Sequence, residues 1–429
     1  MVHWLEIIYF LLLLAALLRC LYFWQLKEYR WDRFREWLKT AEAKRYWLPD
    51  FHFLRPKITV KILLLVLFSL VISRQFIWWL AYLLVPLTAA VSVGLTAPLS
   101  DLIKWLVIGL AKVKLLLFHR WLLVIGITGS FGKTSTKEIL THVLAAKFKV
   151  VKTRETTNTL IGVAKTVLFQ LPLKTEVFVV EMGAYKIGEI ASICRLVRPK
   201  IGVLTGINEQ HLGLFGSQEN IIKAKSELLL ALPKTGLAVV NGVNPITKKL
   251  AADWAPTKYY RAGNFKTNLI GRHQQLNIAA AVAVAKYLGV KQVNLNNIPH
   301  FKTALSQTHG LKGATIINDS YNSNPDGFAA AIGLVKSSRA KQKLLLTSGI
   351  IELGRQSDAV HQRLAVAASP VFDLILTTKA EVSRTFGAEL MTEAEVIKKL
   401  KKILSKNDLL LIEGRFSTQL IKALCSNQS

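Results

Sequence analysis

The sequence predicts an α/β protein with parallel sheets, preceded by an α-helical membrane region. Long apolar runs dominate residues 1–120, whereas from residue 121 onward short β-rich runs alternate with helical patterns. Such alternation is typical of parallel strands that are joined by helices. A glycine-containing turn, GITGSFGKTS at 126–135, lies between the first of these strands and a helical pattern. Phosphate-binding loops occupy this position in α/β domains.

The composition limits the class of protein. The chain has 429 residues, of which 51% are hydrophobic, so it is long enough for roughly two or three domains and too apolar to be disordered. Cys20, Cys194 and Cys425 lie far apart, which argues against a disulfide framework or a cysteine-based zinc site and favours a reducing compartment. The net charge of +29 indicates an anionic partner, either a membrane surface or a phosphorylated substrate. No nucleic-acid partner is expected, because no nucleic-acid-binding motif accompanies the charge.

The first apolar run, at about 5–24, predicts a retained transmembrane helix. Its length matches the ~20 residues that cross a bilayer. A signal peptide is the alternative, but the segment lacks a basic leading region and a small-residue cleavage site. The segment that follows, 25–57, is rich in Lys, Arg and Trp and is therefore expected on the cytoplasmic side.

Two further spans are expected at about 58–73 and 75–96, where they form a hairpin that returns to the same side. The run at 100–120 contains three lysines, which favours a helix lying in the membrane interface over a fourth span. We therefore expect a multi-pass protein of the cell membrane, with membrane lipid as a partner. By parity, the catalytic domains from residue 121 onward lie in the cytoplasm.

Eight strands are expected after the membrane region. They lie within residues 121–128, 177–183, 201–207, 236–242, 313–318, 343–350, 372–378 and 408–414. Polar residues follow several of these runs, and ligands of open α/β sheets bind at the carboxyl ends of strands.

The turn after the first strand has the residues that phosphate recognition needs. Gly129 and Gly132 allow a tight turn around phosphate oxygens, Lys133 supplies positive charge to the β- and γ-phosphates, and Thr134 offers a hydroxyl to Mg²⁺. The spacing departs from the commonest phosphate-loop pattern, because Ile127 occupies the place of its first glycine.

The GITGSFGKTS stretch resembles the ATP loop of the Mur ligase family, the ATP-dependent amide-forming enzymes of peptidoglycan precursor synthesis. Further similar stretches follow in the family's order: NTLIGV at 158–163, EMGAYKIGEI at 181–190, NEQHLGLFGSQENIIKAKSE at 208–227, GRHQQLNIAAAVA at 271–283, NDSYNSNP at 318–325 and IELG at 351–354. Three of them, EMGAYKIGEI, HLGLFGS and DSYNSNP, are most similar to the D-alanyl-D-alanine-adding branch.

The resemblance implies a fold, an activity and substrates. It implies a P-loop-type parallel-sheet ATPase domain at 121–298 and a Rossmann-like C-terminal domain at 299–429. The implied reaction is ATP-dependent and ADP-forming, and it adds D-Ala-D-Ala to a muramoyl tripeptide precursor through an acyl phosphate. The membrane region at 1–120 occupies the place of the family's uridine-nucleotide-binding domain.

The resemblance also assigns roles to individual residues. Those expected at ATP are Gly129, Ser130, Gly132, Lys133, Thr134, Ser135, His273, Asn277, Asp319, Tyr321 and Asn322, and those expected at substrate are Asn158, Thr159 and Asn324. Two Mg²⁺ ions are expected at Thr134, Glu181, His211 and Lys225, and the catalytic residues are Lys133, His211 and Lys225.

Several of these assignments have alternatives. Lys225 is expected to be carbamylated, because a carbamate changes +1 to −1 and supplies oxygen ligands for Mg²⁺; Lys223 is the neighbouring candidate. The residues at 158–159 could equally cap the following helix, and the polar stretch at 319–324 could be a plain turn.

Three positions depart from the family's pattern. Gln274 replaces a usual Asn, Leu311 lies near an expected Arg, and Glu413 replaces a usual Lys. The stretch at 242–270 is also shorter than the usual end of the family's central domain. Two other functions therefore stay open. One is a membrane-bound ligase for another substrate, such as poly-γ-glutamate, and the other is a weakly active ATP-binding scaffold.

Overall fold

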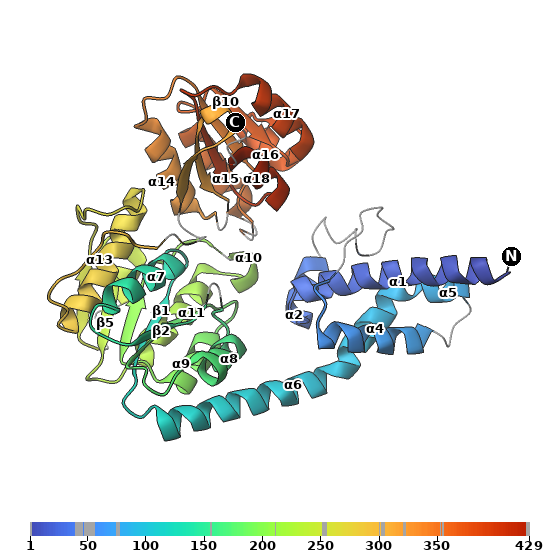
Figure 1. Ribbon diagram of the computed structural model, residues 1–429, viewed down its shortest axis with the longest axis horizontal. Coiled ribbons are helices and arrows are strands. Elements are labelled where there is room, and N and C mark those ends of the chain that lie inside the picture. The colour runs from blue at the N-terminus through green and yellow to red at the C-terminus, as the bar shows by residue number, and fades with distance from the viewer. Residues whose placement is uncertain are drawn as a thin grey trace. The chain divides into compact units, whose positions relative to one another are not determined.

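The computed structural model describes residues 2–38, 46, 56–73, 78–154, 157–210, 212–250, 255–299, 301, 305–320, 323–351, 353 and 356–425. They form two compact units, Met1–Leu106 and Val107–Ser429. Figure 1 shows the helical first unit in blue and the two α/β domains of the second unit in green to red.

The first unit is a small helical assembly with its own core. Its helices are α1 (Val2–Leu26), α2 (Trp31–Leu38), α4 (Val60–Ser73), α5 (Trp78–Leu83) and the first part of α6 (Val85–Phe118). Leu17, Trp24, Leu65 and Ala89 are buried in this core. A hydrogen bond of 2.8 Å joins two buried serine hydroxyls, one from α4 and one from α6. Aromatic and small side chains thus bring the helices together.

One helix in the described part of the chain, Glu6–Leu26, is long and apolar enough to cross a membrane. The run at 58–73 contains α4, which has 14 residues. The expected division between the runs at 75–96 and 100–120 is wrong, because α6 begins inside the first run, at Val85, and continues to Phe118 despite Pro98 inside it. Val93 lies in the core of the first unit and Ala111 in a core of the second unit, so both halves of this helix are packed.

From Val107 onward α6 belongs to the second unit and packs within it. Ala111 is completely buried there, and Val107 and Leu115 lie beside it. Lys114 donates hydrogen bonds through Nζ to the carbonyl oxygens of Leu168 and Leu171, at 3.0 and 2.9 Å. This lysine therefore binds protein, although in the sequence it indicated a helix lying on the membrane.

Sheet A, in the first α/β domain, is parallel throughout. Its order is β2-β3-β1-β4-β5-β6. Its strands are β1 (Leu123–Thr128), β2 (Val150–Lys152), β3 (Val177–Glu181), β4 (Ile201–Leu204), β5 (Leu237–Asn241) and β6 (Thr257–Tyr260). Its helices are α7 (Lys133–Leu144), α8 (Leu160–Gln170), α9 (Glu189–Val197), α10 (Leu212–Phe215), α11 (Gln218–Leu230), α12 (Pro245–Leu250) and α13 (Arg272–Tyr287).

Helices cover both faces of sheet A. Along β1, Val124 packs with α8, α9 and α11, while Ile125 and Ile127 pack with α7 and α13. This alternation follows from the period of two in a strand. Because both faces are buried, the inner strands are apolar at nearly every position.

Sheet B, in the second α/β domain, has the order β11-β10-β9-β12-β8-β7, and its edge strand β7 is antiparallel to β8. The strands are β7 (Ser306–His309), β8 (Thr315–Asp319), β9 (Lys343–Thr347), β10 (Leu374–Thr377), β11 (Glu389–Leu390) and β12 (Leu409–Glu413). The helices are η2 (Leu311–Gly313), α14 (Pro325–Lys336), α15 (Ser357–Ala368), α16 (Ala380–Phe386), α17 (Glu393–Ile403) and α18 (Thr418–Cys425). Leu311, one of the three departures, belongs to the core of this domain.

The predicted α/β class with parallel strands is confirmed. All eight expected strands are present, and the four described strands that the sequence did not indicate, β2, β6, β7 and β11, are the four sheet edges. The parallel order brings the carboxyl ends of β1, β3 and β4 to one edge of sheet A. It likewise brings those of β8, β9 and β12 to one edge of sheet B.

Candidate active site

The loop between β1 and α7 requires glycine at two positions. Gly129 has φ 148° and Gly132 has φ 73°, a region that other residues rarely adopt. A Cβ at Gly129 would lie 2.1 Å from the Thr205 hydroxyl, and one at Gly132 would lie 2.6 Å from Oδ1 of Asn277. The Ser130 amide donates to the carbonyl oxygen of Gly206 at 2.7 Å. The loop is therefore held closely against neighbouring backbone.

Lys133 begins α7 and lies over this loop. Its Nζ donates to the carbonyl oxygens of Gly129 at 2.8 Å and Ser130 at 3.1 Å. Burial lowers the pKa of Lys133, and the nearby Glu181 carboxylate opposes that effect. The arrangement keeps a cation at the N-terminus of a helix, where anions bind. The neighbouring Ser135 is buried in the first turn of α7.

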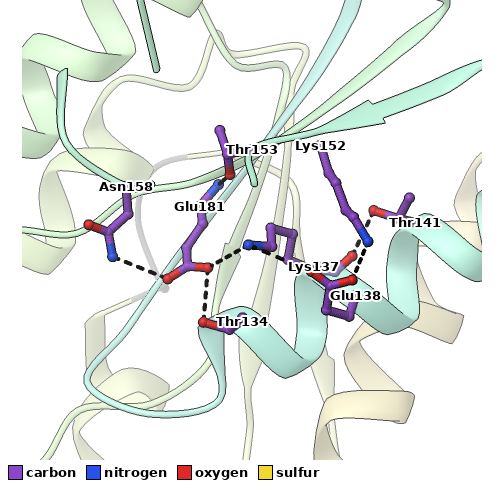
Figure 2. Close-up of polar contacts among 8 residues, drawn as sticks. All are labelled: Thr134, Lys137, Glu138, Thr141, Lys152, Thr153, Asn158 and Glu181. Atoms are coloured by element: carbon purple, nitrogen blue, oxygen red, sulfur yellow. Dashed lines mark hydrogen bonds and ion pairs between the residues drawn. The ribbon is translucent and has the colours of Figure 1, made fainter. Parts of the chain in front are cut away.

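Glu181, the last residue of β3, is the centre of a polar cluster (Figure 2). Thr134 donates from its hydroxyl to Oε2 at 2.9 Å, and Asn158 donates from Nδ2 to Oε1 at 3.2 Å. The amide of Glu181 donates to the Thr153 hydroxyl at 3.1 Å. The structure thus places Thr134 and Glu181, both expected at Mg²⁺, in contact, and it adds Asn158, which was expected at substrate.

Lys137 is a member of this cluster that sequence reasoning missed. It is completely buried, and its Nζ lies 3.0 Å from Oε2 of Glu181 and 3.8 Å from Glu138. Glu138 in turn pairs with Lys152. A signal was present, because Lys137 follows Thr134 by three residues and therefore lies on the same face of a helix.

Lys225 lies on α11 with its side chain buried, whereas Lys223 is exposed. Burial, followed by the positive charge of Lys133, lowers the pKa of Lys225 to about 7. Its Nζ lies 5.8 Å from the centre of the Phe215 ring. At that pKa the Lys225 amine is neutral in a substantial fraction of molecules at neutral pH.

Glu227, two residues further on, is a second residue that sequence reasoning missed. It accepts from the amides of Gly188 and Ala191, and the latter contact measures 2.8 Å. These contacts cap the N-terminus of α9. They fix the start of α9 against α11, the helix that carries Lys225.

Two residues expected at substrate have capping roles in the structure. Thr159 is the N-cap of α8 and accepts from the Gly162 amide at 3.4 Å. Asn324 is the N-cap of α14 and accepts from the Gly327 amide at 3.1 Å. His211, Tyr321 and Asn322 lie outside the described residues.

His273 and Asn277 lie on one face of α13. Burial lowers the pKa of His273 to about 4, so the ring is neutral at physiological pH, and its Nδ1 is buried without a hydrogen-bond partner. Asn277 accepts from the Thr136 hydroxyl at 3.3 Å and donates to Oε1 of Gln274 at 3.0 Å. Gln274, a departure from the family pattern, therefore orients Asn277 between α13 and α7.

Asp319 and Glu413 end the adjacent strands β8 and β12 and lie directly opposite each other. Burial raises the pKa of Asp319 to about 6. Burial and the Asp319 charge raise the pKa of Glu413 well above its ordinary value. The Ser323 hydroxyl donates to Oε2 of Glu413 at 2.7 Å. The departure at Glu413 thus creates a buried acidic pair in which each carboxyl has a raised pKa.

The two α/β domains meet beside the glycine loop. Nδ2 of Asn208 donates to Oδ2 of Asp326 at 2.7 Å. The amide of Asn208 also donates to the Ser130 hydroxyl at 3.3 Å. One residue therefore joins the loop at the carboxyl edge of sheet A, through its backbone amide, to the start of α14, through its side chain.

The donor set of the Glu181 cluster fits Mg²⁺. Hydroxyl and carboxylate oxygens are its preferred ligands, and it commonly binds through one or two protein groups together with substrate phosphates. Within the described residues, no group of three or more His, Cys, Asp or Glu side chains could hold a metal ion. A metal here thus depends on Thr134, Glu181 and oxygens that a phosphate provides.

Comparison with protein families agrees with this geometry. The Mur ligase middle domain matches residues 127–262, and the Mur ligase, glutamate ligase domain matches residues 305–416. The UDP-N-acetylmuramoyl-tripeptide--D-alanyl-D-alanine ligase of Bacillus subtilis (strain 168) is 32% identical over 280 residues, 58% of this chain and 60% of that protein. The chain spans about 60% of the length of such curated relatives.

Solved structures show the same fold. MurF from Acinetobacter baumannii has a TM-score of 0.66 at 25% identity and covers 75% of this chain and 80% of its own. The MurF ligase from Thermotoga maritima in complex with ADP has a TM-score of 0.65 at 24% identity, with coverage of 75% and 82%.

The glycine loop yields a matched pair of variants. Gly132 and Gly216 both have positive φ, 73° and 77°, but a Cβ at Gly216 would meet nothing within 4 Å. We expect Gly216→Ala to lower the free energy of unfolding by about 1–2 kcal/mol through its φ alone. Gly132→Ala should lower it further and also abolish ADP binding, because the loop must move away from Asn277. Denaturation and calorimetric ADP titration measure both effects, and equal losses in the two variants would contradict the contact.

Proposed function

The chain belongs to the Mur ligase family, whose two domain matches together cover more than half of it, and from this we propose that it is an ATP-dependent, ADP-forming ligase that adds D-Ala-D-Ala to a muramoyl tripeptide. The observation that carries the proposal is the contact between Thr134 and Glu181 beside a glycine loop at the carboxyl edge of sheet A. Curated relatives named for this reaction support the choice of substrates.

The proposed reaction has two steps. The carboxylate of the tripeptide attacks the γ-phosphorus of ATP, the bond from that phosphorus to the β-phosphate oxygen breaks, and ADP leaves. The amine of the dipeptide then attacks the acyl carbon, phosphate leaves, and the nitrogen releases a proton. Both steps move negative charge between oxygens, so preorganised cations and donors are the main requirement.

The residues of this chain divide that task. Backbone amides of the loop at 129–132 and the Lys133 ammonium bind the phosphates. Thr134 and Glu181 would hold Mg²⁺, which supplies charge neutralisation for the transferred phosphoryl group. Asn158 keeps the second oxygen of Glu181 in place. A second Mg²⁺, with His211 and Lys225 as ligands, belongs to the same proposal.

A carbamate on Lys225 is part of the proposal. A neutral amine attacks CO₂, a carbon–nitrogen bond forms, and one proton is released, which leaves a carboxylate-like anion. Two observations support it: Lys225 is buried beside another cation, and its pKa of about 7 provides the neutral amine. The anion would also remove the repulsion between Lys225 and Lys133.

We further propose that the chain is a multi-pass membrane protein whose ligase domains lie in the cytoplasm. The apolar helix at Glu6–Leu26 supports attachment to a membrane. The outer face of α6 beside the second unit supports contact with lipid, because Leu110, Leu117 and the following Trp121 are more than half exposed there.

A product-identified ligation assay tests the activity. Protein in nanodiscs with ATP, Mg²⁺ and D-Ala-D-Ala should convert a nucleotide-linked or lipid-linked muramoyl tripeptide to a pentapeptide detectable by mass. Lys133→Ala and Glu181→Gln should reduce turnover by about 10²-fold or more, because each removes a charge at the phosphate site. The absence of product from both donors, together with efficient ligation of glutamate, would replace the proposed substrates.

The carbamate is testable by ¹³C NMR with labelled bicarbonate. The wild type and Lys223→Ala should show a carbamate resonance, whereas Lys225→Ala and Lys225→Arg should lack it and be inactive. The resonance should weaken as pH falls below about 7, since protonation of Lys225 removes the nucleophile. A resonance that persists in Lys225→Ala would show that the modified lysine lies elsewhere.

Topology is testable by proteolysis of sealed inside-out vesicles. The domains from residue 121 onward should be digested without detergent, because they face the outside of such vesicles. Protection there, with cleavage in right-side-out vesicles, would reverse the proposed orientation.

A further inference from the structure

Lys137 is an unexpected neighbour for a carboxylate that binds metal. Figure 2 shows its side chain running from α7 to Glu181, where its Nζ and the Thr134 hydroxyl contact the same oxygen, Oε2, at 3.0 and 2.9 Å. The lysine has no exposed surface, and Glu181 is 1% exposed. An ammonium and a carboxylate therefore form an ion pair inside the protein, at the edge of the candidate metal site.

Such a pair carries a desolvation penalty that apolar residues would avoid. Lysine is almost never fully buried unless it is paired, and replacing a buried pair with apolar residues is often neutral or stabilising. Stability alone thus gives no reason for Lys137. The Lys137 charge therefore matters for its effect on Glu181. It lies against Oε2, the same oxygen that accepts the hydrogen bond from the Thr134 hydroxyl.

The charges around the site explain what Lys137 does. Lys133 and Lys137 are cations on the first turns of α7, and Glu181 lies beside both. The other nearby carboxylates have partners of their own: Glu138 pairs with Lys152, Glu189 accepts from the Tyr185 amide at 2.7 Å, and Glu227 accepts from amides at the start of α9. Glu181 thus has its charge balanced by Lys137 before any ligand arrives. A free divalent cation is therefore attracted only weakly to this carboxylate, because Lys137 already neutralises its charge, and it is repelled by the positive charge of Lys133.

We propose that Lys137 makes binding of Mg²⁺ at Glu181 dependent on nucleotide. It is a positioning residue that holds the carboxylate toward Thr134 and lowers its affinity for free metal. The phosphates of a nucleotide supply the negative charge that the site lacks, so metal and nucleotide enter together. The inference rests on the proposed phosphate and metal site, but it concerns the state without nucleotide.

The test compares Lys137→Met with Lys152→Met. Methionine removes the ammonium and keeps most of the volume of the side chain. Lys152 is the matched control, because it pairs with Glu138 in the same cluster and does not contact Glu181. Mn²⁺, counted by its electron paramagnetic resonance signal, serves as the metal probe, first without nucleotide and then with ADP.

We expect Lys137→Met to bind Mn²⁺ without nucleotide at least about tenfold more tightly than the wild type, since it removes a unit charge near the carboxylate. Lys152→Met should match the wild type. With ADP present, the difference between Lys137→Met and the wild type should become smaller. Equal Mn²⁺ affinity of Lys137→Met and the wild type without nucleotide would overturn the proposal.

Two further measurements control for a loss of folding in Lys137→Met. If Lys137→Met is unstable, added Mg²⁺ should restore its thermal unfolding temperature, because the metal replaces the missing cation. Lys137→Met combined with Glu181→Gln should be stable and insensitive to metal. Instability of Lys137→Met at every Mg²⁺ concentration would contradict the proposal. If the wild type does not bind ADP, the proposed function is contradicted. The Mn²⁺ affinities of Lys137→Met and the wild type, measured without nucleotide, would still test the role of Lys137.

Discussion

The carboxylate of Glu181 is the group on which the site depends. It ends an entirely buried strand, so it is held by backbone that has little freedom to move. Among the described residues, four other side chains form hydrogen bonds with this residue: Thr134 and Lys137 from α7, Thr153 after β2, and Asn158 before α8. A buried carboxylate needs this support, because an uncompensated charge inside a protein destabilises it by several kcal/mol.

The parallel sheet brings those four groups together. In a parallel sheet every strand ends at the same edge, and the helix that follows each strand begins there. The loop after β1 and the end of β3 are therefore neighbours, although Thr134 and Glu181 lie 47 residues apart. Sheet B repeats the arrangement with a different result. Its adjacent strand ends place Asp319 opposite Glu413, so two acids face each other there, whereas in sheet A a lysine pairs with the strand-end carboxylate.

The interior strands could be predicted and the edge strands could not. β1, β3, β4 and β5 are covered by helices on both faces, so their sequences are continuous apolar runs. An edge strand such as β7, whose sequence is SQTH, has one neighbouring strand and much exposed surface. Its pairing comes from backbone hydrogen bonds that any sequence can make. The continuity of α6 could likewise not be predicted, because the burial of Ala111 in the core of the second unit has no signature along the chain.

The sequence by itself determined the α/β class, the glycine loop, and the identity of Lys133, Thr134 and Glu181 as candidate ligand groups. These follow from local patterns: apolar periodicity, glycine at positive φ, and polar residues at strand ends. Only the tertiary structure distinguished Lys225 from Lys223, assigned Thr159 and Asn324 to helix caps, and placed Lys137 on Glu181. Burial and pairing of charge depend on segments that are distant in the chain, because desolvation is a property of the surroundings and not of the residue.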